Sequence, residues 1–328
     1  MFKAVWQAIE NAQNIVLVSH INPDCDTLGC TLALYDVLQK SDKNVFLFNA
    51  TENLPRKLRF MPYFNEIRST LPSKFDAVVV CDCARFDRTG LDIDAIKKEA
   101  KIINIDHHLT NSDFGDVNLV ISPSASASIV VYEMLKRNGI TPSSKAASCL
   151  YTGTIDDTGF FAYGTMNAST FSDMAELVTL GADPVLISKQ LKQSVPLARF
   201  RLKEYVARSF DLLRNGMVGL VFIWQEDLKR TGAKREDTED IINLIRDIVS
   251  VEMAVMILEE EDGSFKVSLR SKNYLDVSKI ALKFGGGGHF GAAGFESGIT
   301  HAGDIAKMIL NEFDKGIKEY GTKMVTQE

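Results

Sequence analysis

The sequence has no long hydrophobic run and no excess of basic residues. Its longest apolar stretches, such as Met217–Trp224, are too short to cross a bilayer, and residues 1–13 lack the apolar core of a signal peptide. We therefore expect a cytoplasmic protein without a membrane partner. The chain has 37 Lys and Arg residues against 43 Asp and Glu residues, a net charge of −6. This balance argues against binding of long duplex nucleic acid, which depends on many phosphate contacts.

Cysteine is also scarce, and its pattern excludes a disulfide framework. The five cysteines are an odd number, and no two of them are spaced as C-x-x-C. We therefore expect reduced thiols, as in the cytosol. Cys81 and Cys83 flank Asp82 in an apolar run, where cysteine usually acts as a small buried hydrophobic residue.

The chain does have enough residues, 328, for two domains. In the first half, short apolar runs alternate with segments of helical periodicity, which predicts an α/β fold with a mostly parallel sheet wrapped by helices. The predicted strands are residues 14–19, 44–49, 75–81 and 101–105, and the predicted helices are residues 27–40, 125–138, 143–154 and 167–180.

The pattern changes after about residue 185. An amphipathic helix is predicted over residues 197–214 as the connection to a smaller α/β unit with a mixed sheet. In that unit we expect strands at residues 217–224, 252–258 and 265–270, and helices at residues 236–248 and 277–284. The predicted organisation is a first domain over residues 1–190, a helical linker over 191–215 and a second domain over 216–328.

Acidic residues and histidines gather where the predicted elements of the first domain end. Each such cluster alone could be a turn or a helix cap. Several of them follow strands, and ligands in open α/β sheets bind at the carboxyl ends of the strands. We therefore expect one shared site. The clusters are His20-Ile21-Asn22-Pro23-Asp24-Cys25-Asp26, Asp82, Asp106-His107-His108 and Asp156-Asp157-Thr158-Gly159.

Together the clusters offer metal ligands of mixed imidazole and carboxylate type. A donor set without thiolates favours Mn²⁺ over Mg²⁺ or Zn²⁺. The set is too large for one ion and suits two ions that share a bridging carboxylate. Paired ions with a bridging hydroxide are the usual apparatus for displacement at phosphorus. The predicted ligands are His20, Asp24, Asp26, Asp82, His107 and Asp157.

These motifs resemble those of the DHH phosphoesterase superfamily. The first three are H-x-N-P-D-x-D, an Asp at the end of the next buried strand, and D-H-H; the fourth is D-T-G. Later in the chain, Ser268-Leu269-Arg270-Ser271-Lys272 and the run G-G-G-G-H-F-G-A-A-G over residues 285–294 resemble the DHH-associated C-terminal domain. The resemblance extends from about residue 14 to residue 300. It implies a catalytic metal-binding domain followed by a substrate-binding domain.

The resemblance also implies a role for each ligand. One ion would be held by His20, Asp24 and Asp82. The other would be held by Asp26, Asp82, His107 and Asp157, so that Asp82 bridges the two ions. His108 corresponds to the family histidine that faces the scissile phosphate. Where the family has T-D-T-G, this chain has two consecutive aspartates, and we assign Asp157 as the ligand because it keeps the spacing to Thr158-Gly159. Asp156 is then a supporting residue.

In the second domain the resemblance implies contacts with substrate phosphate. Consecutive glycines let backbone N–H groups approach an anion, and an arginine fork suits a terminal phosphate. In the first domain, Arg88 resembles a family arginine near the site, although Arg85 lies close to it in the sequence. The predicted substrate-binding residues are Arg270, Gly286, Gly287, Gly288, His289 and Arg88.

Within the superfamily, chains of this length are most similar to the nanoRNase and pAp phosphatase group. The resemblance implies hydrolysis of very short oligonucleotides to 5′-mononucleotides, or of 3′-phosphoadenosine 5′-phosphate (pAp) to AMP. A soluble cyclic- or linear-dinucleotide phosphodiesterase is the alternative. A RecJ-like exonuclease, an inorganic pyrophosphatase and a non-catalytic nucleotide sensor fit less well. The chain has no room for an added nucleic-acid-binding domain, it carries G-G-G-G-H, and it keeps every ligand. Substrate ranking, direction of attack, RNA or DNA preference and assembly as a homodimer stay open.

Overall fold

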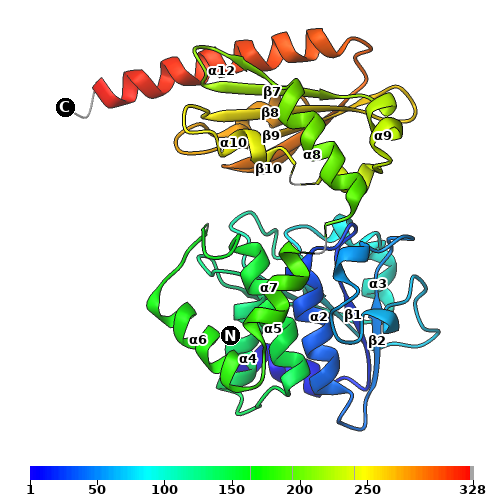
Figure 1. Cartoon of the computed structure of the whole chain (residues 1–328). Helices are drawn as coiled ribbons and strands as arrows, with labels where there is room; N and C mark the ends of the chain where they lie inside the picture. The colour runs from blue at the N-terminus through cyan, green and yellow to red at the C-terminus, as the bar shows by residue number, and fades with distance from the viewer. Residues whose placement is uncertain (163, 194, 240, 326–328) are drawn as a thin grey trace. The chain divides into compact units, whose positions relative to one another are not determined.

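The computed structural model describes residues 1–162, 164–193, 195–239 and 241–325, with the side chains of all of these except His289 and residues 319–325. The chain divides into two compact units, Met1–Ser194 and Val195–Glu328, and each has its own sheet (Figure 1). The first unit carries all of the predicted metal ligands. The second carries Arg270 and the glycine run.

The first unit is built on a five-stranded sheet. Its strands are β1 (Asn14–Val18), β2 (Asn44–Phe48), β3 (Ala77–Cys81), β4 (Lys101–Asp106) and β5 (Val117–Val120). They lie in the order β2-β1-β3-β4-β5, and every neighbouring pair is parallel. Ile15 and Leu17 enter a core on one face, whereas Val16 and Val18 enter a core on the other. The strands are apolar on both faces because helices and turns cover both, as the sequence predicts.

Helices and short 3₁₀ turns connect these strands. They are α1 (Phe2–Glu10), α2 (Cys25–Leu38), η1 (Arg56–Leu58), η2 (Phe64–Glu66), η3 (Phe86–Thr89), α3 (Ile93–Glu99), α4 (Ala127–Arg137), α5 (Ser144–Asp157), α6 (Ala168–Thr179) and α7 (Pro184–Lys192). The larger core lies beneath α1, α2, α4 and α5, and the smaller core lies beneath η3 and α3. The larger core therefore supports α2 and α5. The start of α2 and the end of α5 carry acidic residues at the sheet edge.

The second unit contains a six-stranded mixed sheet, which confirms the predicted fold class. Its strands are β6 (Asp211–Leu213), β7 (Val218–Ile223), β8 (Met253–Glu259), β9 (Phe265–Ser271), β10 (Gly287–His289) and β11 (Ala292–Ser297). Their order is β10-β11-β9-β8-β7-β6, with β7 and β8 parallel and every other pair antiparallel.

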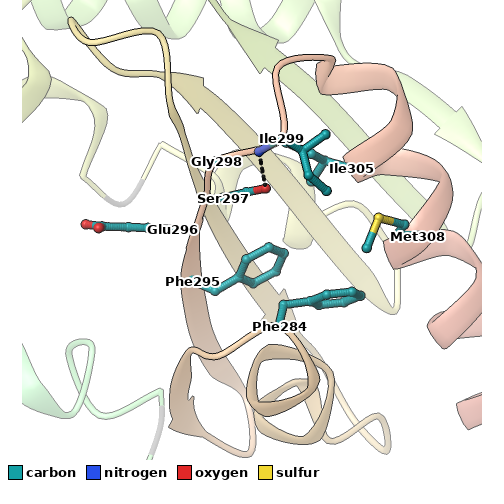
Figure 2. A pocket seen from close by; sticks show the side chains of 8 residues that line it. All are labelled: Phe284, Phe295, Glu296, Ser297, Gly298, Ile299, Ile305 and Met308. Atoms are coloured by element: carbon teal, nitrogen blue, oxygen red, sulfur yellow. Dashed lines mark hydrogen bonds between the residues drawn. The ribbon is translucent and has the colours of Figure 1, made fainter.

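Helices cover both faces of this second sheet. They are α8 (Leu197–Ser209), α9 (Gln225–Thr231), η4 (Arg235–Thr238), α10 (Asn243–Arg246), α11 (Val277–Lys283) and α12 (Ala302–Val325). One face forms a core with α11 and α12, and the other forms a core with α8, α9 and α10. On the first of these faces, a pocket of about 210 Å³ is lined by Phe284, Phe295, Ile305 and Met308 among others (Figure 2).

Two helices predicted for the second unit are wrong in extent. The helix predicted over 197–214 ends at Ser209, and the chain continues as strand β6. Arg214 and Asn215, both with positive φ, then make the turn into β7. The helix predicted over 236–248 is two short pieces, η4 and α10. Buried residues keep the helical spacing across this segment, but the backbone is extended at Glu239, where ψ is 136°.

The five cysteines are all buried in the first unit, and all are free thiols. Burial raises the pKa of Cys83 to about 11 and also raises the pKa of Cys25, Cys30 and Cys149. No helix in the described part of the chain is both long enough and apolar enough to cross a membrane.

Candidate functional site

Three adjacent parallel strands of the first sheet end at the same edge. β1 leads into His20, β3 leads into Asp82, and β4 ends at Asp106. Neighbouring parallel strands share their carboxyl edge, so the side chains that follow them converge. The start of α2 adds Asp24 and Asp26, and the end of α5 adds Asp157. All six residues predicted as ligands therefore come together at this edge.

Asp82 belongs to two groups of donor atoms, one with His20 and Asp24 and the other with Asp106, His107 and His108. His20 Nε2 lies 3.6 Å from Asp24 Oδ2 and 3.8 Å from Asp82 Oδ2. His107 Nε2 lies 3.6 Å from Asp82 Oδ1 and 3.6 Å from Asp157 Oδ2. Asp26, His107 and Asp157 form a third group, which His107 links to Asp82. Asp82 thus presents one carboxylate oxygen to each group, which is the arrangement that a bridging ligand requires.

Asp82 itself is held in a conformation that is costly without a ligand. Its side chain is 5% exposed, its φ is 55°, and its Oδ1 is buried with no hydrogen-bond partner among the described residues. Left-handed backbone and an unsatisfied buried oxygen are both unfavourable, and both occur at functional sites. Burial, together with the charges of Asp26, Asp24 and Asp157, raises the pKa of Asp82 well above its ordinary value. A cation between these carboxylates would remove both the repulsion and the unsatisfied acceptor, so the donor set fits divalent metal ions.

Asp26 is fixed by the N-terminus of α4. Its Oδ2 accepts a hydrogen bond from Ala127 N at 2.7 Å, and its Oδ1 accepts one from Ser128 N at 2.9 Å. Close packing of α2 on α5 holds it in place. A Cβ added to Gly153 of α5 would lie 2.8 Å from Asp26 Oδ1 and 2.2 Å from Ser128 Oγ. Gly153 therefore permits the close approach that positions this ligand.

The loop that carries His20 and Asp24 is fixed by hydrogen bonds at both ends. Asp24 caps α2, and its Oδ1 accepts from Asp26 N at 3.0 Å and from Thr27 N at 3.1 Å. At the other end, Asn49 Nδ2 donates to His20 O at 2.8 Å. The sequence prediction included neither Asn49 nor Thr27. Asn49 follows a strand at the same sheet edge, which is the signal that could have identified it.

Asp106 orients His108 and was missed as a site residue. It is fully buried, and its Oδ1 lies 2.7 Å from His108 Nδ1. Its Oδ2 accepts a hydrogen bond from Asn111 Nδ2 at 2.5 Å. Burial alone would lower the pKa of His108, but the hydrogen bond and charge of Asp106 outweigh it and raise that pKa. An acid that ends an apolar run and directly precedes two histidines is the sequence feature that could have revealed this role.

The structure distinguishes Arg88 from Arg85, and Asp157 from Asp156, by their distance from the cluster around Asp82. Arg88 Nη2 lies 3.5 Å from His20 Nδ1, whereas Arg85 makes a two-point contact with Asp87, at 3.1 Å through Nε and 2.6 Å through Nη2. Of these two arginines, Arg88 is thus the one near the cluster.

Asp157, but not Asp156, belongs to a group of donor atoms that could hold a metal ion.

In the second unit, Arg270 lies on β9 next to Ala292 of β11. Gly287 and Gly288 of the glycine run begin strand β10, whereas Gly285 and Gly286 precede it. A Cβ at Gly286 would lie 2.2 Å from Gly294 O, and one at Gly288 would lie 2.5 Å from Ala292 O. These two glycines are therefore required by packing against β11. At Gly287 an added Cβ would meet no atom within 4 Å. The His289 side chain lies outside the described part of the chain.

Comparison with protein-family models gives two matches along this chain. The model of the DHH family, N-terminal domain, matches residues 14–154, and that of the DHHA1 domain matches residues 218–317. The first range contains the cluster around Asp82. The second contains Arg270 and the glycine run.

Individual proteins resemble the chain over most of its length. A bifunctional oligoribonuclease and PAP phosphatase NrnA from Thermus thermophilus is 30% identical over 294 residues, which cover 88% of this chain and 85% of that protein. A probable protein of the same description from Streptococcus mutans is 27% identical, over 94% of this chain and 98% of that one. The crystal structure of an exopolyphosphatase-related protein from Bacteroides fragilis superimposes with a TM-score of 0.85 at 26% identity, and covers 100% of this chain and 97% of that one.

Proposed function

This chain belongs to the DHH family, and from that premise we propose that it hydrolyses very short oligonucleotides to 5′-mononucleotides and pAp to AMP. The Thermus and Streptococcus relatives, which bear both activities in their names, support this proposal. The observation that carries it is the placement of Asp82, whose two carboxylate oxygens face two different groups of donor atoms. Such an arrangement suits phosphoester hydrolysis with paired divalent ions.

We assign the ions, with Mn²⁺ as the preferred metal, to the two groups. His20, Asp24 and Asp82 would hold one ion. Asp26, His107 and Asp157 would hold the other, together with Asp82, whose Oδ1 lies 3.6 Å from His107 Nε2. When bound, the ions would neutralise charge on the phosphate and lower the pKa of water so that it becomes a nucleophile. The protein's part is to hold Asp26 by two backbone N–H groups and to keep Asp82 in its left-handed conformation.

His108 is assigned to the scissile phosphate. Its Nδ1 is engaged with the buried Asp106, so the contact with a phosphate oxygen would be made through Nε2. Asp106 favours the protonated ring, which can donate a charge-assisted hydrogen bond to phosphate. Asn111 fixes the other oxygen of Asp106 and so limits rotation of its carboxylate.

The substrate's remaining phosphates are assigned to Arg270, His289 and the glycines Gly286, Gly287 and Gly288, with Arg88 as a further contact near the metal cluster. The Gly286 N–H already donates to Ala281 O at 2.9 Å, so this glycine would contribute close approach of the backbone and no hydrogen bond. An arginine fork matches the geometry of a terminal phosphate better than a lysine does. This division gives hydrolysis to the first unit and substrate selection to the second. It accounts for action on short substrates by a chain whose net charge is −6.

The experiment is a substrate panel with the full-length protein and Mn²⁺. Dinucleotides, pAp, pApA, pGpG, cyclic dinucleotides, and 5′- and 3′-end-labelled oligomers of graded length are incubated with and without EDTA. We expect release of 5′-mononucleotides from the shortest oligomers and of AMP from pAp, both abolished by EDTA. Release from cyclic dinucleotides in preference to these would favour the alternative phosphodiesterase. Binding of nucleotides without any release would contradict the proposal and favour a sensor.

A further inference from the structure

A buried glutamate lies at the start of β8, the strand beside the one that carries Arg270 (Figure 1). Glu252 directly precedes β8 and is 3% exposed. Its Oε1 accepts hydrogen bonds from three consecutive backbone N–H groups, those of Asn273 at 3.1 Å, Tyr274 at 2.8 Å and Leu275 at 3.0 Å. Its Oε2 accepts one from Asn273 Nδ2 at 3.1 Å. Hydrogen bonds to a carboxylate are about twice as strong as those between neutral groups.

The three N–H groups belong to the bend that follows β9. Residues 272–275 connect β9, which ends at Ser271, to α11, which begins at Val277. Successive backbone N–H groups in such a bend form an anion-binding concavity, and here the Glu252 carboxylate fills it. Lys272 N donates to the backbone oxygen of Glu252 at 3.0 Å. Every residue of the bend is therefore hydrogen-bonded to Glu252.

The ends of this bend are joined to the turn between β10 and β11. At one end, Ser271 N donates to Gly291 O at 3.0 Å, and Ser271 Oγ donates to Phe290 O at 3.2 Å. At the other end, Val277 N donates to Phe290 O at 3.0 Å. Strand β10 is only three residues long and lies at the edge of the sheet, so its pairing with β11 alone holds it weakly. The bend therefore helps to fix the turn that directly follows His289.

We infer that Glu252 is a positioning residue, which holds the bend after β9 and thereby fixes Arg270 and His289 relative to each other. This inference rests on the proposed function, in which these two residues contact substrate phosphate, and adds a residue that acts on them from the protein side. Strand pairing places Ala292 of β11 between them, so they stand on strands that do not pair directly. Without Glu252, the bend would lose its shape and β10 could shift against β9.

The first test compares initial rates with Mn²⁺ on pAp and on bis-p-nitrophenyl phosphate, which lacks the second phosphate of pAp. Glu252→Gln keeps one acceptor oxygen but places an amide N–H₂ at the other position, and Glu252→Ala removes both acceptors. We expect the KM for pAp to rise about threefold in Glu252→Gln and about tenfold in Glu252→Ala. The kcat for pAp should stay within about twofold, the pattern of lost substrate binding. Hydrolysis of bis-p-nitrophenyl phosphate should also stay within about twofold.

Two further variants separate positioning from stability. Glu259 ends the same strand, and its Oε2 accepts a hydrogen bond from Gln225 N at 2.9 Å. Glu259→Gln therefore weakens a similar bond away from the bend and should leave the KM for pAp unchanged. Ser271→Ala removes the side-chain bond to Phe290 O alone. It should raise the KM for pAp about threefold, and it tests the link to the turn even where Glu252→Ala fails to fold.

Hydrogen exchange followed by mass spectrometry gives a readout that does not depend on hydrolysis. In Glu252→Gln, peptides that cover residues 271–277 and 287–292 should both exchange faster than in the wild type, whereas in Glu259→Gln neither should. Faster exchange in the first peptide alone, an unchanged KM for pAp, or equal losses on both substrates would overturn the inference. Failure of the wild-type protein to release AMP from pAp would instead overturn the proposed function, and the exchange data would still show whether Glu252 holds both segments.

Discussion

At the scale of single residues, the site concentrates carboxyl groups whose mutual repulsion a bound cation would relieve. Asp82→Asn removes the carboxylate that is proposed to bridge the two ions. We expect the chelated variant to be at least as stable as the chelated wild type, because the raised pKa of Asp82 reflects burial and repulsion that Asn does not experience. Hydrolysis with Mn²⁺ should fall by more than about 100-fold, beyond the usual effect of losing a supporting residue. Urea unfolding in EDTA and initial rates with Mn²⁺ test both statements. A near-wild-type rate would refute the bridging assignment.

The two consecutive aspartates at the end of α5 allow a comparison within one motif. Partial burial and the neighbouring charges of Asp26 and Asp24 raise the pKa of Asp157 to about 9, and its Oδ2 lies 3.6 Å from His107. Asp157→Asn should therefore weaken Mn²⁺ binding strongly. Asp156→Asn should cost at most about 10–100-fold in metal affinity or rate, as expected for a residue that supports a ligand. Calorimetric titration with Mn²⁺ measures which of the two variants loses more metal affinity. Equal or reversed losses would mean that Asp156 is the ligand.

The ligands could be predicted from the sequence because each follows a recognisable element, and parallel strands share one edge. The supporting residues were harder to predict. The Asn111 side chain acts on the His108 ring through Asp106, and the Asn49 side chain reaches His20 from the end of a different strand. Such contacts depend on which loops meet in space. A single sequence shows the polarity of these residues but not their partners.

At the scale of elements, the packing of α2 on α5 sets the position of Asp26. Gly153→Ala would place a methyl group against Ser128 Oγ and Asp26 Oδ1. We expect a loss of about 1–3 kcal/mol in the free energy of unfolding, and weaker Mn²⁺ binding because Asp26 must move. Gly303→Ala in α12, where an added Cβ meets nothing within 4 Å, is the matched control. It should be neutral or stabilising by up to about 1 kcal/mol. Denaturant unfolding with metal titration would show whether the two effects occur together.

Asp36 ties three elements together away from the candidate site. This buried carboxylate accepts hydrogen bonds from Lys40 Nζ at 2.8 Å, Tyr63 OH at 2.7 Å and Ser143 Oγ at 2.5 Å. Burial raises the pKa of Asp36, but these hydrogen bonds outweigh it and lower that pKa below 3.8. A lowered folded-state pKa stabilises the protein above the unfolded-state pKa, and the contribution is lost as pH falls through the folded-state value.

Asp36→Asn should therefore destabilise the protein by about 2 kcal/mol at pH 7. The difference from wild type should shrink as the pH is lowered below about 4, because the wild-type carboxyl group then becomes protonated as well. Urea unfolding at a series of pH values measures this. Asp42→Asn, at an exposed position, should change stability by less than about 0.5 kcal/mol throughout. A difference that does not depend on pH would show that the charge of Asp36 contributes nothing.

The elements themselves were predicted unevenly. The apolar strands β1, β3 and β4 stand out because both of their faces are covered. The strands β10 and β11 did not, since glycine and alanine have little strand propensity, and pairing with β9 is what makes them strands. Strand pairing also explains why the helix predicted over 197–214 was too long. Residues 211–213 pair with β7, and this pairing outweighs their helical periodicity.

At the scale of the whole molecule, one tryptophan in each unit allows the units to be followed separately. Trp6 is buried in the first unit, and Trp224 is 38% exposed in the second. In Trp224→Phe, unfolding is reported by Trp6, and Mn²⁺ at 100 times its Kd should stabilise that transition by about 2.7 kcal/mol. In Trp6→Phe, the transition reported by Trp224 should not shift. Equal shifts in both variants would mean that the two units unfold as one cooperative body.

The distribution of cysteine has a practical consequence for such studies. All five thiols are buried in the first unit, and burial raises the pKa of at least four of them. Maleimides and related reagents attack the accessible thiolate, so the folded protein should react with them slowly. A single cysteine introduced on the second unit, for example Lys307→Cys on α12, would then accept a dye selectively. The chain can thus be labelled at one chosen point while every native cysteine stays in place.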